Sequence, residues 1–121
     1  MQAVVVFAHG SRDPLWRGPI EAVADAVRAR SPSTPVVCAY LELCEPSLPA
    51  AIGQLAALGA TRVRVLPVFF GMGRHAREDL PGLLAGLSGD HPTLHFEVLP
   101  TVGEDPRVTQ LLAQLALENT A

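Results

Sequence analysis

Aromatic side chains, lysine and cysteine are scarce in this sequence of 121 residues. Aromatic residues make up 5% of the chain, so Val, Leu and Ala must form most of any core. Lysine is absent and all nine basic residues are Arg, but the formal net charge of -3 argues against a nucleic-acid binder that relies on bulk charge. The two cysteines, Cys38 and Cys44, are too few for a disulfide framework, and we expect both as reduced thiols.

Long apolar runs are also missing. No segment approaches the roughly 20 consecutive apolar residues that span a bilayer. The first residues lack the basic n-region of a signal peptide and pass directly into a strand pattern, so we expect a cytoplasmic protein with no membrane partner. Hydrophobic residues nevertheless make up 49% of the chain, which excludes disorder and predicts one folded domain over residues 1–121.

Apolar runs alternate with helical patterns along the chain. We expect strands at residues 3–8, 35–41, 63–70 and 94–99. The helices between and after them are expected to begin between Asp13 and Pro19, after a cap at Ser47, after a cap at Asp79 with Pro81 in the first turn, and at Asp105-Pro106. This order predicts an α/β fold, an open and mainly parallel four-stranded sheet with helices on both faces.

Two histidines follow apolar strands of the predicted sheet. His9 stands in the stretch AHGSRD after the first strand, and His75 stands in GMGRHA shortly after the third. Ligands of open α/β sheets bind at the carboxyl ends of the strands, and those ends meet at one edge. A turn histidine bonded to the backbone is the simpler interpretation of either residue alone, but their common position favours one shared metal site.

Glu42 follows the second strand and is the carboxylate expected beside both histidines, with Glu45 as a substitute. Two imidazoles and one carboxylate suit cobalt, iron or nickel and leave coordination positions open. Cys44 offers a soft alternative ligand, although a partly buried thiol is the simpler interpretation. The remaining histidines, His91 and His95, are expected to be structural or solvated.

Basic residues surround the two histidines in the sequence. Three arginines lie within three residues of His9 or His75, and guanidinium groups bind carboxylates with paired hydrogen bonds. The loop after the first strand leads to a helix N-terminus, which attracts anions, and glycines after the third strand permit a close backbone approach. The expected substrate-binding residues are Ser11, Arg12, Gly73, Arg74 and Arg77.

Two common motifs are absent. GMGRHA lacks the last glycine of the dinucleotide fingerprint GxGxxG, and Ser11 does not stand in the GxSxG turn of a hydrolase. Dinucleotide binding and nucleophilic hydrolysis therefore fit poorly, and a small-molecule hydrolase or transferase stays a third hypothesis that activity without metal would distinguish. Trp16 is expected either to cover the mouth of the pocket or to pack on the first helix.

Four segments carry a resemblance to a known family: AHGSRDPLW, YLELCEPSL, LPVFFGMGRHAREDLP and LPTVGEDPRV. In order and spacing they resemble the short, single-domain sirohydrochlorin chelatases of the CbiX type. The resemblance implies insertion of a divalent metal, cobalt first and iron or nickel as alternatives, into sirohydrochlorin or a related tetrapyrrole in cobalamin or sirohaem biosynthesis. It implies that His9, His75 and Glu42 are both metal ligands and catalytic groups.

The same resemblance implies the partners. The metal is a substrate, no organic cofactor is expected, and the short form, which lacks a second homologous half, is expected to work as a homodimer. The alternative hypothesis is a non-catalytic carrier of a divalent metal or a tetrapyrrole with the same fold, which predicts binding without rate enhancement.

Overall fold

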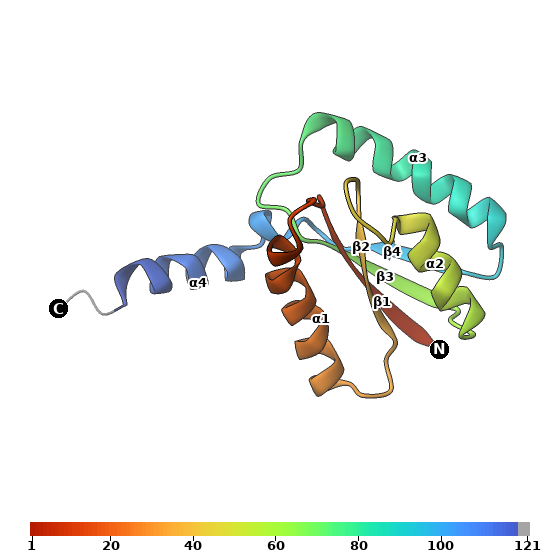
Figure 1. The fold of residues 1–121 in the computed structure, drawn as a ribbon, viewed down its shortest axis with the longest axis horizontal. Helices are drawn as coiled ribbons and strands as arrows, with labels where there is room; N and C mark the ends of the chain where they lie inside the picture. Colours follow the sequence, from red (N-terminus) through yellow and green to blue (C-terminus); the bar gives the residue numbers. More distant parts are fainter. Residues whose placement is uncertain (119–121) are drawn as a thin grey trace.

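The structure, a computed structural model, describes residues 1–118, apart from the side chains of His75 and Ala76. Strands and helices alternate along the chain (Figure 1). Their order is β1 (Gln2–Ala8), η1 (Pro14–Arg17), α1 (Gly18–Arg30), β2 (Val36–Tyr40), α2 (Leu48–Ala57), β3 (Arg62–Pro67), α3 (Arg74–Asp90), β4 (His95–Val98), η2 (Val102–Glu104) and α4 (Pro106–Leu117).

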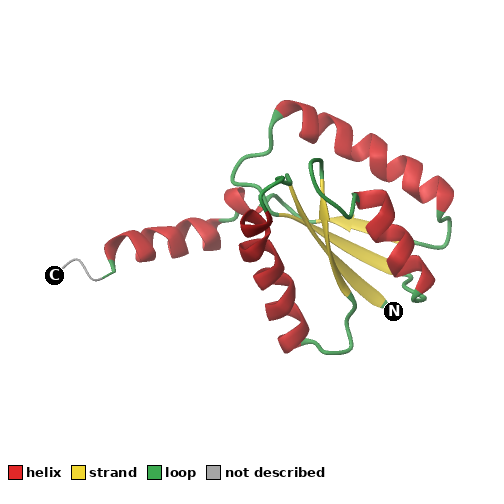
Figure 2. Cartoon of the chain, viewed as in Figure 1, coloured by secondary structure: helices red, strands yellow, loops and turns green. Residues whose placement is uncertain are grey.

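The four strands form one sheet in the order β2-β1-β3-β4, and every neighbouring pair is parallel (Figure 2). α1 packs on one face of the sheet, while α2 and α3 cover the other. The predicted α/β class, the parallel sheet and the helices on both faces are therefore confirmed. Since β1 lies between β2 and β3, the loops that follow these three strands meet at the carboxyl edge.

Side-chain caps begin two of the helices where the sequence predicts them. The Ser47 hydroxyl accepts the N–H of Ala50 at 3.3 Å at the start of α2. The Asp105 carboxylate accepts the N–H of Arg107 at 2.8 Å at the start of α4. These oxygens satisfy N–H groups that have no partner within the helix, which is why Ser and Asp are favoured there. Both predicted caps are confirmed.

The predicted start of the third helix is wrong. α3 begins at Arg74 with Gly73 as its N-cap, five residues before the predicted cap at Asp79, and Pro81 lies inside the helix. Proline lacks an N–H group, so the usual hydrogen bond to the carbonyl of Arg77 is missing. Pro81 is exposed, and on the solvent side water can satisfy that carbonyl. The expectation that Pro81 belongs to the first turn of the helix therefore placed the start of the helix too late.

The third strand is also shorter than predicted. β3 ends at Pro67, whereas the apolar pattern predicted a strand that continues to Phe70. Pro67 still pairs with Phe7 of β1, and the chain then turns away through residues 68–73. This loop connects β3 to α3 and borders the carboxyl edge of the sheet.

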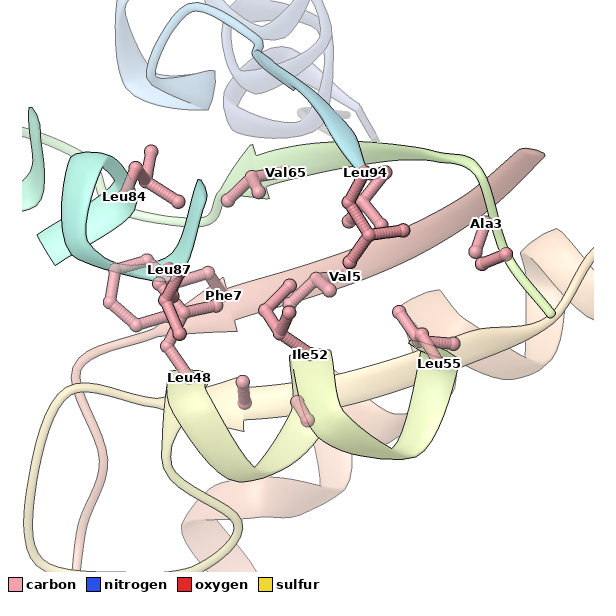
Figure 3. Close-up of a cluster of buried hydrophobic side chains, with 14 of the residues drawn as sticks. Ala3, Val5, Phe7, Leu48, Ile52, Leu55, Val65, Leu84, Leu87 and Leu94 are labelled. Carbon is pink, nitrogen blue, oxygen red and sulfur yellow. The ribbon is translucent and has the colours of Figure 1, made fainter. Parts of the chain in front are cut away.

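Two apolar clusters hold the layers together. The larger one lies between the sheet and the pair α2 and α3, with Phe7, Ile52 and Leu55 among its fully buried members (Figure 3). The smaller one lies between the sheet and α1, where Val6, Ile20 and Ala24 meet. Burial of one aliphatic side chain stabilises a fold by about 1.5–3 kcal/mol, so the two clusters fix the strand ends that carry the loops.

α4 has a different environment from the other helices. It extends away from the sheet and from α1, α2 and α3 (Figure 1), and none of its residues is buried. The predicted apolar residues Leu111, Leu112 and Leu115 are 52%, 39% and 54% exposed. No helix in the described part of the chain is long and apolar enough to cross a membrane.

Candidate metal and anion site

The loops that follow β1 and β2 run side by side beyond the ends of the strands. The N–H of Leu41 donates to the carbonyl of Ala8 at 2.9 Å, and the N–H of Glu42 donates to that of His9 at 3.0 Å. These two hydrogen bonds continue the parallel ladder past the last paired residues, Ala8 and Tyr40. They therefore fix the backbones of His9 and Glu42 next to each other.

Gly10 makes this close approach feasible. A Cβ atom at this position would lie 1.8 Å from the carbonyl oxygen of Glu42, and the backbone has a φ of 104°. Both conditions exclude side chains of L-amino acids. The glycine directly after His9 is therefore required by the packing of the two loops.

The side chains of His9 and Glu42 face each other across this junction. Nε2 of His9 lies 3.2 Å from Oε1 of Glu42, and Nδ1 of His9 lies 3.2 Å from the carbonyl oxygen of Gly10. The two side chains are 53% and 56% exposed, so their attraction is screened by water and contributes little to stability. The pair is thus accessible to a ligand from solvent.

The same geometry suits a metal ion. Bonds of about 2.0–2.2 Å from one ion to an imidazole nitrogen and a carboxylate oxygen place these two atoms roughly 3–3.5 Å apart. The observed separation of 3.2 Å falls in that range. Among the residues whose side chains are described, no group of three or more His, Cys, Asp or Glu side chains is arranged to hold a metal. The structure therefore brings together two of the three residues that the sequence predicts as ligands.

The third predicted ligand, His75, is the second residue of α3. Its side chain lies outside the described residues, so its place in the site stays a prediction. Its neighbour Arg74 and the cap residue Gly73 do line the same hollow as His9 and Glu42. The start of α3 is therefore next to the His9–Glu42 pair.

This hollow has a volume of about 550 Å³, within the range of small-molecule sites. Residues of the loops after β1 and β2 form one wall, and the loop after β3 and the first turns of α3 form the other. The residues that line it are His9, Leu41, Glu42, Phe69, Gly71, Gly73, Arg74 and Asp79. Apolar walls and a few converging polar groups are typical of ligand sites.

Asp79 is the residue that sequence reasoning assigned to the wrong role. It was expected to cap α3, whereas it lies in the second turn of that helix and lines the hollow. The sequence carried a signal for this placement, because position 79 follows His75 by four residues, one turn of an α-helix. The signal was missed because Pro81 was expected in the first turn of the helix, which places position 79 at the cap.

The other predicted anion-binding residues are distributed around the rim. Arg74 is exposed and donates through Nε to Glu78 at 3.0 Å. Ser11 accepts the N–H of Asp13 at 3.1 Å, and Arg12 is exposed in the same loop. Arg77 lines a separate hollow of about 340 Å³ between α3 and the segment after β4. Gly73 and Arg74 therefore lie beside the His9–Glu42 pair, whereas Arg77 lies farther along α3.

Residues offered as substitutes lie elsewhere. Glu45 lines another hollow, of about 600 Å³, beside β2, together with Cys38 and Tyr40. The ring of Trp16 packs on that of Tyr40 with the centroids 6.2 Å apart, and Trp16 is not among the residues that line the site. Glu42 is therefore the carboxylate that the fold presents to His9.

The fold and the site define a parallel α/β domain whose strand-end loops bring an imidazole nitrogen and a carboxylate oxygen together beside an arginine. Residues 3–119 match the model of the family described as CbiX. The chain belongs to the CbiX family.

Individual relatives are in keeping with this. The chain is 32% identical over 124 residues to a sirohydrochlorin cobaltochelatase of Methanothermobacter thermautotrophicus, a match that covers 90% of this chain and 86% of the relative. A crystal structure of a putative cobalamin (vitamin B12) biosynthesis CbiX protein from Marinobacter aquaeolei VT8 superposes with a TM-score of 0.83 at 28% identity, covering 96% of this chain and 94% of that one.

A longer relative has the same fold. The sirohydrochlorin chelatase SirB from Bacillus subtilis subspecies spizizenii, in complex with cobalt, superposes with a TM-score of 0.78 at 26% identity. The match covers 93% of this chain and 48% of SirB, so the chain spans about half of that protein's length.

Proposed function

We propose that this chain inserts a divalent metal ion, cobalt in the first place, into sirohydrochlorin. The observation that carries the proposal is the His9–Glu42 pair, whose ligand atoms lie 3.2 Å apart in the hollow beside Arg74. The related cobaltochelatase and the cobalt complex of SirB support the choice of metal and tetrapyrrole. Iron and nickel are the alternative metals, since the same ligands bind them as well.

The proposed reaction exchanges one metal ion for two protons. Sirohydrochlorin loses the protons of two pyrrole N–H groups, and four ring nitrogens then bind the divalent ion. His9 and Glu42, with His75 as the proposed third ligand, leave coordination positions of the incoming ion open, so the ring nitrogens can displace its remaining ligands. The imidazole of His9 and the carboxylate of Glu42 are the groups proposed to accept the pyrrole protons.

The arginines are proposed to orient the substrate. Sirohydrochlorin carries many carboxylates, and exposed guanidinium groups at the rim form charge-assisted hydrogen bonds with them. Arg74 is the nearest to the metal pair, with Arg12, Ser11 and Gly73 on the adjoining loops and Arg77 along α3. His75 is proposed as the third metal ligand, on its place after the third strand and on the resemblance.

A single copy covers only one face of the flat macrocycle, so we propose a homodimer whose second copy covers the other face. The match to about half of SirB supports this, because a longer chain has room for a second half. A cytoplasmic location stays a prediction.

The test is metal insertion followed by the absorbance change of sirohydrochlorin on metallation, with cobalt, iron and nickel in turn. His9→Ala and Glu42→Gln are expected to lose roughly a hundredfold or more in rate. His95→Ala is the matched control, since His95 is exposed on β4 and absent from the site. Because His9 is also exposed, its removal leaves no cavity, and the free energy of unfolding should change by less than about 1 kcal/mol.

Three outcomes contradict the proposal in different ways. Unchanged rates in both site variants exclude the His9–Glu42 pair from the chemistry. Tight binding of metal and tetrapyrrole without faster insertion than in the uncatalysed reaction indicates the carrier instead. Chemical conversion of a small molecule by the chain in the absence of added metal indicates a hydrolase or transferase.

A further inference from the structure

Leu43 has a backbone conformation that leucine rarely adopts. Its φ is 69°, and within residues 1–118 it is the one residue other than glycine with a positive φ. In this left-handed region the Cβ atom of an L-residue crowds a neighbouring carbonyl oxygen, whereas glycine has no Cβ atom. The position directly after Glu42 therefore carries a strain that glycine would relieve.

The core gains little from this leucine. Leu43 is 48% exposed and belongs to neither apolar cluster. Residues held in strained backbone conformations gather at ligand sites, where the strain is part of the function. The fold itself gives no reason for a leucine at this position, which indicates a contact with a ligand.

The loop that carries Leu43 is closed on the end of β2. It rises beyond the end of the sheet between β2 and α2 (Figure 1). The loop leaves from Tyr40 and returns to it, since the N–H of Tyr40 donates to the carbonyl of Pro46 at 2.9 Å and Tyr40 pairs with Ser47. The N–H of Glu42 is bonded to the loop after β1 as well. The strained side chain therefore extends from a backbone that is held in place.

A second exposed apolar residue belongs to the opposite wall of the hollow. Phe70 is 73% exposed, belongs to neither apolar cluster, and stands between Phe69 and Gly71, which both line the hollow. Its backbone is held against η2 by the hydrogen bond from the N–H of Gly103 to the carbonyl of Phe69, at 3.0 Å. Leu43 directly follows two residues that line the first wall. Each wall thus carries one large, exposed apolar residue next to the lining of the hollow.

We propose that Leu43 and Phe70 contact one face of the tetrapyrrole macrocycle, one from each wall, and that this contact offsets the strain at Leu43. The inference rests on the proposed function and deepens it by naming two residues that position the substrate. A tetrapyrrole has flat apolar faces and peripheral carboxylates, so exposed apolar side chains suit the faces as arginines suit the periphery. Because both backbones are held in place, little conformational freedom is lost when the macrocycle binds.

Leu43→Gly tests the strain and the contact together. Without the Cβ atom the strain disappears, so the melting temperature of the free chain should rise by roughly 2–5 °C. The lost apolar contact should weaken the binding of metal-free sirohydrochlorin by about tenfold, the value of covering one half-exposed leucine. Leu43→Met retains an apolar side chain of similar volume and should bind sirohydrochlorin as the wild-type chain does.

Leu58→Gly is the matched control. Leu58 is also exposed, but it ends α2 with a φ of -81° and does not line the hollow. Glycine there relieves no strain and adds freedom to the unfolded chain, so the melting temperature should fall while the affinity for sirohydrochlorin stays unchanged. Phe70→Ala should weaken binding by about tenfold and leave the melting temperature unchanged, because removal of an exposed ring leaves no cavity.

Kinetics distinguish a contact with the substrate from an indirect effect through Glu42. If Leu43 touches the macrocycle, Leu43→Gly raises the KM for sirohydrochlorin and leaves kcat nearly unchanged. A melting temperature of Leu43→Gly below that of the wild-type chain, an unchanged affinity, or a fall in kcat at unchanged KM overturns the proposal.

The inference and the proposed function can fail separately, because binding is measured without metal. An active wild-type chain whose Leu43→Gly variant binds sirohydrochlorin equally tightly contradicts the contact alone. A wild-type chain that binds sirohydrochlorin through Leu43 and Phe70 but inserts no metal contradicts the chelatase activity alone.

Discussion

Replacement of Gly10 by Ala tests the close contact between the loop that carries His9 and the loop that carries Glu42. Two costs add at this position. The backbone has a φ of 104°, a conformation that costs an L-residue about 2 kcal/mol. The new methyl group would lie 1.8 Å from the carbonyl oxygen of Glu42, and relief of such an overlap in packed structure costs about 1–3 kcal/mol.

The sum is about 3–5 kcal/mol, which lowers the melting temperature of a chain of this size by roughly 10–20 °C. Gly59→Ala is the matched control, because Gly59 has a φ of 90° but the nearest atom to its added methyl group is Met1 Cε at 3.8 Å. The control therefore carries the conformational cost alone, about 2 kcal/mol. Thermal unfolding followed by circular dichroism compares the two variants.

The rate of metal insertion is a second measurement on the Gly10→Ala variant. Relief of the overlap in Gly10→Ala must move the backbone of Glu42 away from that of His9, so insertion is expected to slow as well. Gly59 lies at the opposite end of the sheet, after α2, so Gly59→Ala should retain the wild-type rate at a temperature where it is folded. Equal melting temperatures for the two variants would refute the close approach of the loops.

Three further predictions concern stability. Burial raises the pKa of Tyr40 to about 12. Because this is the only tyrosine in the sequence, ultraviolet titration should show no phenolate near pH 10 in the folded chain. The stability that the neutral phenol provides should be complete below pH 10 and decline as pH rises toward 12. Hydrogen bonds from the Arg107 side chain and N–H lower the pKa of Asp105 from 3.8 to about 2. The stability that this carboxylate provides should be complete above pH 3.8 and decline toward pH 2, and this pH dependence should vanish in Asp105→Asn, as measured by unfolding against pH. Ile52→Ala, at a fully buried position, should cost about 2–5 kcal/mol in denaturant unfolding, and a cost near zero would contradict the assigned core.

Local signals in the sequence were sufficient for most of the elements. The apolar run of residues 3–8 became β1, and Ser47 and Asp105 cap helices as their side-chain chemistry predicts. These features depend on neighbours a few residues away, so a single sequence contains the information. The positions of His9 and Glu42 followed equally from their places after strands.

Other features depend on contacts between distant segments. The apolar runs of β1, β2 and β3 are alike in composition, so nothing local distinguishes the strand in the middle. The reason for a glycine at position 10 is its contact with the carbonyl of Glu42, 32 positions later, and no local pattern indicates that contact. The start of α3 was missed because Pro81 is tolerated where its side of the helix faces solvent. The isolation of α4 could not be predicted from its apolar pattern, which is also typical of a helix packed on its own sheet.

The central position of β1 has a consequence for synthesis. Of the four strands, β1 is translated first, and it pairs with residues 36–40 on one side and with residues 62–67 on the other. Roughly 60 further residues must be translated before that second side can be filled, which takes roughly 3–12 s at ordinary elongation rates of about 5–20 residues per second. During this interval the nascent chain carries an apolar strand with an open edge, the form most prone to pair with another chain. The nascent chain is therefore most exposed to pairing with another chain before β3 has been translated.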